Sequence, residues 1–429
     1  MKPQSRNLFD LSHFSMQLGE IGRLQTVTKI PTLPGDSINL EIAGVVKMSP
    51  LRRDLILDAL VEFYAFWVPY RHIYGEDWLD FIRQGNDESV SFDSVDNDDM
   101  APYLACNHRG DLPLWITAGY NRIYNRYFRP PTDDSKILSD TYIANDDRTR
   151  DFGVRCGFKP RLWSATIDRE LGTSDETVGV SSNRLNLMDL EQAKKHLRTE
   201  LEREWFAQRY RDVMDNTWGT TVNIDADERP DFLYRSGFWL SGVDVNGTSG
   251  DSLGQFAGKS MALGGMRMPS RFFNEHGTLW VMALTRFPTI FNDEKHYLEG
   301  KANPSYRDLA GDPTIMSAQP PMRIDTDDFF GYGGDSNVGT RPFGDWYREH
   351  PSYCHVRFDN LDGFPFYDDK NKTKNELREI DSSKYENVFQ TTQQGHYRLQ
   401  LRCNAKAKRY VPLTSTPESL SPNLSLIHI

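Results

Sequence analysis

The stretch from Ala59 to Trp78 constrains the fold of this chain more than any other. Up to Val68, apolar side chains occupy both sides of a β pleat, and Glu62 is the only polar residue. A strand that is apolar on both faces has no face to offer to water, so it belongs inside a sheet that is packed on both sides. Pro69 ends the pattern because proline has no N–H to donate to a neighbouring strand. The two expected faces are Val61, Phe63, Ala65 and Trp67 on one side and Leu60, Tyr64, Phe66 and Val68 on the other.

Strand patterns recur along the rest of the chain, separated by long polar connections. The aromatic share of 12%, with 23 Pro and 31 Gly, favours strands and turns over helical bundles. There is no βαβ rhythm and no low-complexity linker, so we expect an antiparallel sandwich or jelly roll in a single domain over residues 1–429. Connections of tens of residues usually have a function, so we expect the loops to make contacts. The further expected strands cover residues 21–30, 37–47, 221–224, 232–240, 279–287, 347–358 and 397–405.

Helical patterns are fewer. Residues 78–82 form a short amphipathic pattern, and residues 120–128 carry aromatic side chains at helical spacing. The one long helix is expected near residues 187–214, where Asn186 can cap its first turn.

The ends of the chain differ from its middle. Residues 1–20 are polar with scattered apolar side chains, which predicts an arm that docks onto something rather than folding alone. We expect the strands to be distributed over about 21–405, and residues 406–429 to form a C-terminal tail.

Charge, cysteine content and hydropathy narrow the functional class. The net charge of −11, from 61 acidic and 50 basic residues, argues against a protein that condenses nucleic acid by itself. The four cysteines lie far apart without a C-x-x-C pair, which favours free thiols in a reducing cytoplasm. No signal peptide and no apolar run of membrane-spanning length is present, so we expect a soluble cytoplasmic product without membrane insertion.

Motifs for catalysis or cofactor binding are missing from the sequence. The ten histidines are scattered, and neither H-E-x-x-H nor G-x-S-x-G nor a Walker loop occurs. Acidic clusters at 96–99, 225–228, 244–251 and 325–328 would suit Ca²⁺, but none has EF-hand spacing, and solvated loop charge explains them better. We therefore expect no catalytic residue, no metal ligand and no cofactor, with Ca²⁺ as the one weakly supported ion. A pair of carboxylates for glycoside hydrolysis stays open, because such a pair need not be close in sequence.

Basic residues suggest where nucleic acid would be contacted. In residues 120–129 arginines alternate with aromatic side chains, a combination that provides both phosphate contacts and stacking for a single strand. An ordinary packed helix with one wet face has the same pattern, so both interpretations stay open. The candidate nucleic-acid contacts are Arg122, Arg126 and Arg129, and more weakly Arg52, Arg53, Lys406, Lys408 and Arg409.

Several segments, in one order along nearly the whole chain, resemble the major capsid proteins of the Microviridae, the tailless icosahedral single-stranded DNA phages of the phiX type. They are DLSHFSMQLGEIGRL (10–24), MSPLRR (48–53), FYAFWVPYRHIYGEDW (63–78), QRYRDVM (208–214), SGVDVNGTSGDSLGQFAG (241–258), PSRFFNEHGTLWVMALTRFP (269–288), LAGDP (309–313), DWYREHPSY (345–353) and LDGFPF (361–366).

The resemblance implies an all-β fold with inserted helices: an eight-stranded antiparallel jelly roll with long inter-strand loop insertions. It implies a structural protein that self-assembles into a T=1 icosahedral shell around a circular single-stranded DNA genome. Assembly in the bacterial cytoplasm with scaffolding proteins, a spike protein and a small basic DNA-binding protein is also implied, and the last would offset the negative charge. Sites for a host surface sugar or for Ca²⁺ match no recognisable motif here, so no residues are assigned to them.

Two alternatives from other classes remain at this point. A carbohydrate-binding jelly roll would expose a row of aromatic side chains, with Trp163, Trp218 and Trp239 as candidates. A glycan-hydrolysing jelly roll would bring two carboxylates together in a cleft.

Overall fold

The computed structural model of the chain describes the two sheets and the elements that pack on them. The described residues are 6–51, 58–75, 78–79, 81–82, 94–96, 104–106, 111–129, 150–153, 162–165, 210–222, 229–243, 259–287, 290–291, 296–325, 337–348, 350, 366–367, 389 and 395–411.

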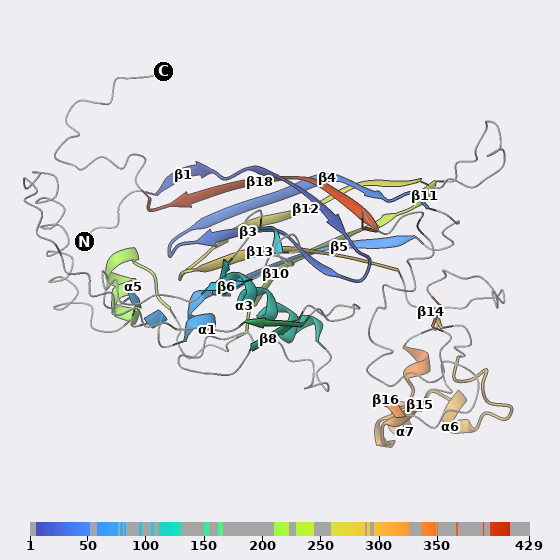
Figure 1. Cartoon of the computed structure of the whole chain (residues 1–429). Coiled ribbons are helices and arrows are strands. Elements are labelled where there is room, and N and C mark those ends of the chain that lie inside the picture. The colour runs from blue at the N-terminus through green and yellow to red at the C-terminus, as the bar shows by residue number, and fades with distance from the viewer. Residues whose placement is uncertain are drawn as a thin grey trace, which may run out of the picture.

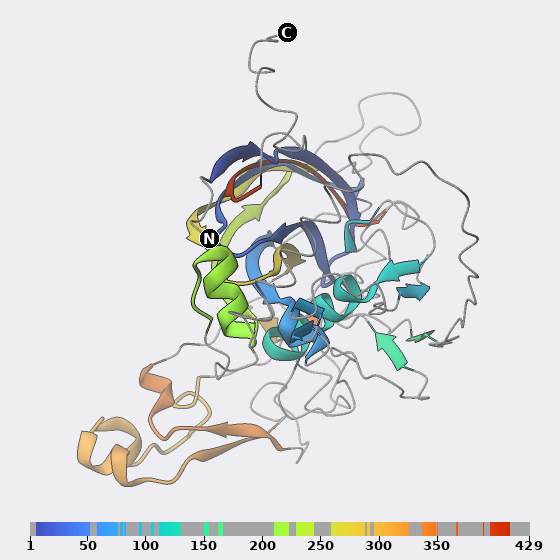
Figure 2. The ribbon, with the colours of Figure 1, turned by 90° about the vertical axis from the view of Figure 1, so that its left-hand side faces the viewer.

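Two antiparallel sheets face each other (Figures 1 and 2). The first sheet has six strands: β1 (Asn7–Asp10), β18 (Tyr397–Arg409), β4 (Ser37–Met48), β12 (Lys259–Phe272) and β11 (Gly242–Val243) in that order, with β2 (His13–Gly19) also paired to β18. The second sheet has four strands in the order β10 (Asp231–Leu240), β5 (Ala59–Pro69), β13 (Gly277–Arg286) and β3 (Leu24–Thr32).

Eight of these strands pair like a long hairpin that has been rolled up. In chain order they are β2, β3, β4, β5, β10, β12, β13 and β18, and the first pairs with the last. The second pairs with the seventh, the third with the sixth and the fourth with the fifth, always antiparallel. This nested pairing is that of a jelly roll, so the expected eight-stranded fold is confirmed.

The space between the sheets is the main core. Val61, Phe63, Ala65 and Trp67 of β5 enter it, together with the inward residues of β4, β13 and β18. The alternating sequence of β18 fits this place because every second side chain, from Tyr397 to Ala407, is buried.

The other face of the four-stranded sheet forms a second core, under a layer of helices. These are α1 (Tyr70–Tyr74), α3 (Leu114–Ile123), the π-helix η2 (Tyr124–Phe128) and α5 (Tyr210–Trp218), and Figure 1 shows them below the sheet. Phe66 and Val68 of β5 pack here with Trp280 of β13. Gly119 lets α3 approach the sheet, since a Cβ at that position would lie 2.9 Å from Cζ2 of Trp280. The prediction of a central strand covered on both faces is confirmed.

The remaining described elements are short. They are β6 (Ser94–Asp96), β7 (Asp111–Pro113), β8 (Arg150–Gly153), β9 (Leu162–Ala165), β14 (Ile290–Phe291), α6 (Tyr306–Leu309), α7 (Pro313–Ala318), β15 (Met322–Asp325), β16 (Asn337–Arg341), the 3-10 helix η5 (Asp345–Tyr347) and β17 (Phe366–Tyr367). None of the helices among the residues described above is long and apolar enough to cross a membrane.

Several sequence expectations need correction. Thr221 and Val222 do not lie in a strand, and Tyr347 ends a 3-10 helix instead of starting a strand. The expected tail from residue 406 begins inside β18, and the expected arm contains β1 and β2, which both pair with β18. Of the helix expected at 187–214, residues 187–209 lie outside the described residues, and the described part belongs to α5, which continues to Trp218. That the chain is a single domain stays a prediction.

The sequence analysis predicted no strand at β12, a strand that contains Gly264, Gly265 and Pro269. In the structure, a Cβ on Gly265 would lie 1.9 Å from the carbonyl oxygen of Ile42, so this position allows no side chain. Pro269 lies at a register shift between Met268 and Arg271, where the ladder is interrupted and needs no donor.

Candidate assembly and nucleic-acid surfaces

The outer face of the six-stranded sheet is left open. In Figures 1 and 2 no described helix or strand lies over it, in contrast to the helix-covered face of the other sheet. Because the side chains of a strand alternate, the register of the strands decides which residues share this face.

A basic group of side chains lies on this open face. The outward residues of β18 include Arg398, Arg402, Lys406 and Lys408, all exposed. Lys47 of β4 pairs with Arg398, and Arg267 of β12 pairs with Glu41 of β4, so both point the same way. We call Lys47, Arg267, Arg398, Arg402, Lys406 and Lys408 the basic sheet face; Asp10 and Glu41 are acidic residues among them.

Exposed apolar side chains flank the basic sheet face. Phe14 and Leu18 of β2 lie on one side, and Met261 and Leu263 of β12 lie on the other. The guanidinium of Arg402 lies 5.9 Å from the ring centre of Phe14. A face that combines exposed apolar and cationic side chains is typical of a surface that a partner covers.

Of the predicted contacts, Lys406 and Lys408 lie on this face, but Arg409 does not. Its Nε lies 3.0 Å from Oδ2 of the fully buried Asp36, and its Nη2 donates to the carbonyl oxygen of Pro31. Asp36 also accepts a hydrogen bond from the backbone N–H of Leu33, although burial raises the pKa of its carboxyl group to about 6. Arg409 thus fastens the end of β18 to the turn before β4.

The three arginines of the predicted basic helix differ in their exposure to solvent. Arg122 is only 1% exposed, Arg126 is exposed and Arg129 is half-buried. The helix widens to a π-turn at Tyr124, whose carbonyl accepts from the backbone N–H of Arg129 at 2.9 Å, so α-helical spacing does not place these side chains together. Arg122 is part of the packed interior, and the nucleic-acid contact stays a prediction for Arg126 and Arg129. Arg52 and Arg53 lie outside the described residues.

Polar residues that resemble catalytic groups are buried under the helices instead. The ring of His276 packs against Trp78 at 5.5 Å and Trp218 at 4.9 Å, and burial lowers its pKa to about 4. Beside it, Nε of Arg71 lies 3.2 Å from Oε2 of Glu275. Desolvation raises the pKa of Glu275 despite that arginine. Arg71, Glu275 and His276 are all buried, with aromatic rings against the histidine.

Among the described residues no group of three or more His, Cys, Asp or Glu side chains could hold a metal ion. Of the two cysteines that the structure describes, Cys106 and Cys403, both are free thiols.

A jelly roll with one face covered by its own helices and one open, basic and apolar face has the form of a structural subunit that binds partners. The comparisons with known proteins agree. Residues 2–181 and 177–419 match the family of phage capsid proteins described as "Capsid protein (F protein)". The chain therefore belongs to the phage capsid protein F family.

Relatives match along nearly the whole length. Capsid protein F of Escherichia phage G4 is 37% identical over 416 residues, covering 94% of this chain and 95% of the relative. Capsid protein F of Enterobacteria phage phiK is 37% identical over 416 residues, with 95% and 96% covered. That of Escherichia phage alpha3 is 36% identical over 426 residues, with the same shares. The predicted Microviridae resemblance is confirmed, the chain is a structural capsid protein of the virion, and the carbohydrate-binding alternative is not supported.

The basic sheet face shows what sequence reasoning missed. Lys406 and Lys408 were predicted as contacts because they are close together in the sequence, and Arg398 and Arg402 were missed. All four belong to the alternation of buried and exposed residues along β18. That alternation was the available signal for them. Lys47 and Arg267 join the face only through strand register, for which the sequence carries no local signal.

Proposed function

We propose that this chain forms a T=1 icosahedral shell around a circular single-stranded DNA genome, with the basic sheet face toward the genome. The single observation that supports this orientation is the gathering of Lys406, Lys408 and their neighbours on an uncovered face of a protein with a net charge of −11. A polyanion concentrates at such a face because cationic side chains displace its counterions.

We also propose that the chain carries out no catalysis and needs no cofactor. Assembly takes place in the bacterial cytoplasm with scaffolding proteins, and the finished shell carries a spike protein. A small basic DNA-binding protein supplies most of the charge that the acidic shell lacks. A host surface sugar and Ca²⁺ are further proposed ligands, without assigned residues.

The orientation is tested with the double variant Lys406→Glu/Lys408→Glu. Binding of circular single-stranded DNA to purified subunits is measured from low to physiological salt. Losing two phosphate contacts should reduce the slope of log K against log salt by about 1.4, at about 0.7 per contact on a single strand. The control Arg211→Glu/Arg323→Glu makes the same change in charge at exposed positions away from the face and should leave the slope unchanged.

Equal slopes for both double variants would exclude the basic sheet face as a genome contact. Independently, shells of the wild-type chain alone should bind DNA weakly, because the subunit is acidic overall. Tight binding by such shells at physiological salt would contradict the need for a basic partner.

A further inference from the structure

Residues 296–348 contain a small folded unit that Figures 1 and 2 show standing apart from the two sheets. Its centre is Trp346, whose ring stacks on Tyr297 at 4.2 Å and meets Phe343 edge-on at 5.0 Å. The indole Nε1 of Trp346 donates to the carbonyl oxygen of Asp308 at 3.1 Å. We call the described residues 296–325 and 337–348 the side unit.

Asp308 holds the side unit together. Its carboxylate accepts from Nζ of Lys301 at 2.8 Å, and from the backbone N–H and Oγ of Ser305 at 2.9 and 2.7 Å. Lys301 and then Ser305 keep the pKa of Asp308 below its ordinary value, so the carboxylate is charged at neutral pH. The unit is thus pre-organised by its own contacts, which reduces the entropic cost when a surface of it binds a partner.

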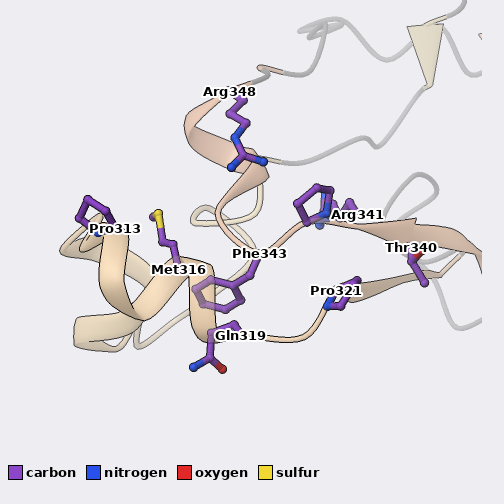
Figure 3. A pocket seen from close by; sticks show the side chains of 9 residues that line it. Pro313, Met316, Gln319, Pro321, Thr340, Arg341, Phe343 and Arg348 are labelled. Atoms are coloured by element: carbon purple, nitrogen blue, oxygen red, sulfur yellow. The ribbon is translucent and has the colours of Figure 1, made fainter.

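A hollow of about 600 Å³ lies between α7, η5 and the β15–β16 hairpin (Figure 3). Met316 and Phe343 contribute apolar surface to it, and Arg341 and Arg348 contribute guanidinium groups. The other lining residues are Pro313, Gln319, Pro321, Thr340 and Pro342. A volume of this size admits a few side chains of a peptide segment.

Arg341 and Arg348 both line the hollow, and the guanidinium of Arg341 lies 5.7 Å from the ring centre of Tyr297. Nε of Arg341 is buried and has no hydrogen-bond partner in the described part of the chain. Nη1 of Arg348 lies 3.9 Å from Oδ1 of Asp345, which is too long for a hydrogen bond, and its side chain is largely exposed. The chemistry of the hollow therefore favours a carboxylate with apolar neighbours.

The side unit also exposes large apolar residues that do not line the hollow. Tyr306 is 70% exposed, Leu309 is 55% exposed and Tyr347 is 51% exposed. The hydroxyl group of Tyr347 donates to the carbonyl oxygen of Leu309 at 2.7 Å, so these two residues lie together. Contiguous exposed apolar residues of this kind are typical of surfaces that bind a partner.

We propose that the hollow of the side unit binds an acidic and apolar segment of a neighbouring copy of this chain. Identical neighbours carry a net charge of −11, which complements the two guanidinium groups, and a protruding unit suits the head-to-tail contacts that close a ring. The inference rests on the proposed assembly into a shell and goes beyond it by naming the gripping surface.

The test compares Arg348→Glu with Arg323→Glu in the full-length chain, expressed with the phage's other structural proteins. Arg323 is exposed on the same unit but does not line the hollow, so the change in charge is matched. Sedimentation should show at least ten-fold fewer shells for Arg348→Glu and near-normal numbers for Arg323→Glu. Thermal unfolding of the soluble subunits should be alike, which separates loss of assembly from loss of folding.

Two further measurements keep the proposal open to refutation. Gln319→Glu adds a negative charge to the hollow at a different position and should reduce shell yield in the same direction. Suppressors of Arg348→Glu should be acidic-to-basic changes in this same chain, and a particle map should show a neighbour's segment in the hollow.

The outcomes separate the two proposals. If the wild-type chain formed no closed shell, the proposed function and this inference would fail together. If shells formed but Arg348→Glu assembled as well as Arg323→Glu, or if the map showed the hollow open or filled by a different protein, only this inference would be overturned.

Discussion

The outer faces of the two sheets have opposite surroundings. The four-stranded sheet buries its outer face under α1, α3, η2 and α5, where Trp280 and Phe66 are completely enclosed. The six-stranded sheet turns Phe14, Met16 and the basic sheet face toward solvent. The subunit thus covers most of one outer surface by itself, although Trp239 at the β10 edge stays 54% exposed, and it leaves the other surface for partners. Stability and assembly should therefore depend on different residues, which mutations can separate.

The largest expected difference is between two phenylalanines. Phe66 is 1% exposed and Phe14 is 76% exposed. Phe66→Ala should lower the free energy of unfolding by about 3–5 kcal/mol, because it leaves a cavity in a packed core. Phe14→Ala should change it by less than about 0.5 kcal/mol, as for other exposed positions. Urea unfolding of unassembled subunits measures both, and equal losses would contradict the division between the faces.

Acid should lower the stability of the folded subunit through a histidine that is buried under the helices. His276 has a pKa lowered to about 4 by burial, whereas an unfolded histidine titrates near 6.5. As the pH falls below about 6.5 the unfolded state takes up a proton that the folded state refuses, so stability is lost until about pH 4, by up to about 3 kcal/mol. His276→Phe keeps the contacts with Trp78 and Trp218 and should make this acid limb of the stability curve shallower. The limb should not vanish, because burial also lowers the pKa of His72 to about 3 and that of His396 to about 4.

The control for that experiment is His350→Phe, which replaces an exposed histidine. Its profile of unfolding free energy against pH should follow the wild type between pH 4 and 7. A wild-type profile that is already flat in this range would show that His276 is not held neutral.

A smaller effect on the free energy of unfolding is expected from Glu62, which lies on the helix-covered side of β5. Glu62 is buried on β5 and forms ion pairs with Arg235 and, at 2.9 Å, with Nε of Arg286. Although desolvation raises the pKa of Glu62, hydrogen bonds from Arg286 and Arg235 hold it below its ordinary value. Glu62→Gln should cost about 1–3 kcal/mol, since it removes a charged acceptor but both arginines keep access to water. The loss should be seen at neutral pH and should shrink as the pH falls from about 4.5, the ordinary value for glutamate, toward the lower pKa of the folded carboxylate, as measured by denaturant unfolding.

The sequence predicted the helix-covered sheet better than it predicted the open one. Two-sided apolar character fixes β5 as an interior strand, and both of its faces were assigned correctly from alternation alone. The pairing of β2 with β18, nearly four hundred residues apart, has no local signal and follows only from the nested topology. No strand was predicted at β12, where glycine and proline, which normally interrupt strands, mark a close approach and a bulge.

The open side was predicted only in fragments. Lys406 and Lys408 were noticed because they are close together in sequence, but Arg409 looks equivalent to them and instead pairs with the buried Asp36. Arg122 and Arg126 are four residues apart, yet the π-turn and the packing of α3 separate their surroundings. Charge in a sequence therefore predicts that a surface exists, while register and burial decide which charges belong to it.

The smallest expected effect on folding tests whether the open face is free to serve partners. Arg402 contacts the ring of Phe14 at 5.9 Å on the solvent side of β18, and an exposed contact of this kind contributes about 0.5 kcal/mol. Arg402→Ala should therefore unfold in urea within about 0.5 kcal/mol of the wild type, while its affinity for circular single-stranded DNA falls and its salt slope drops by about 0.7. A large loss of stability with unchanged DNA binding would mean that the basic sheet face holds the subunit together instead of serving the genome.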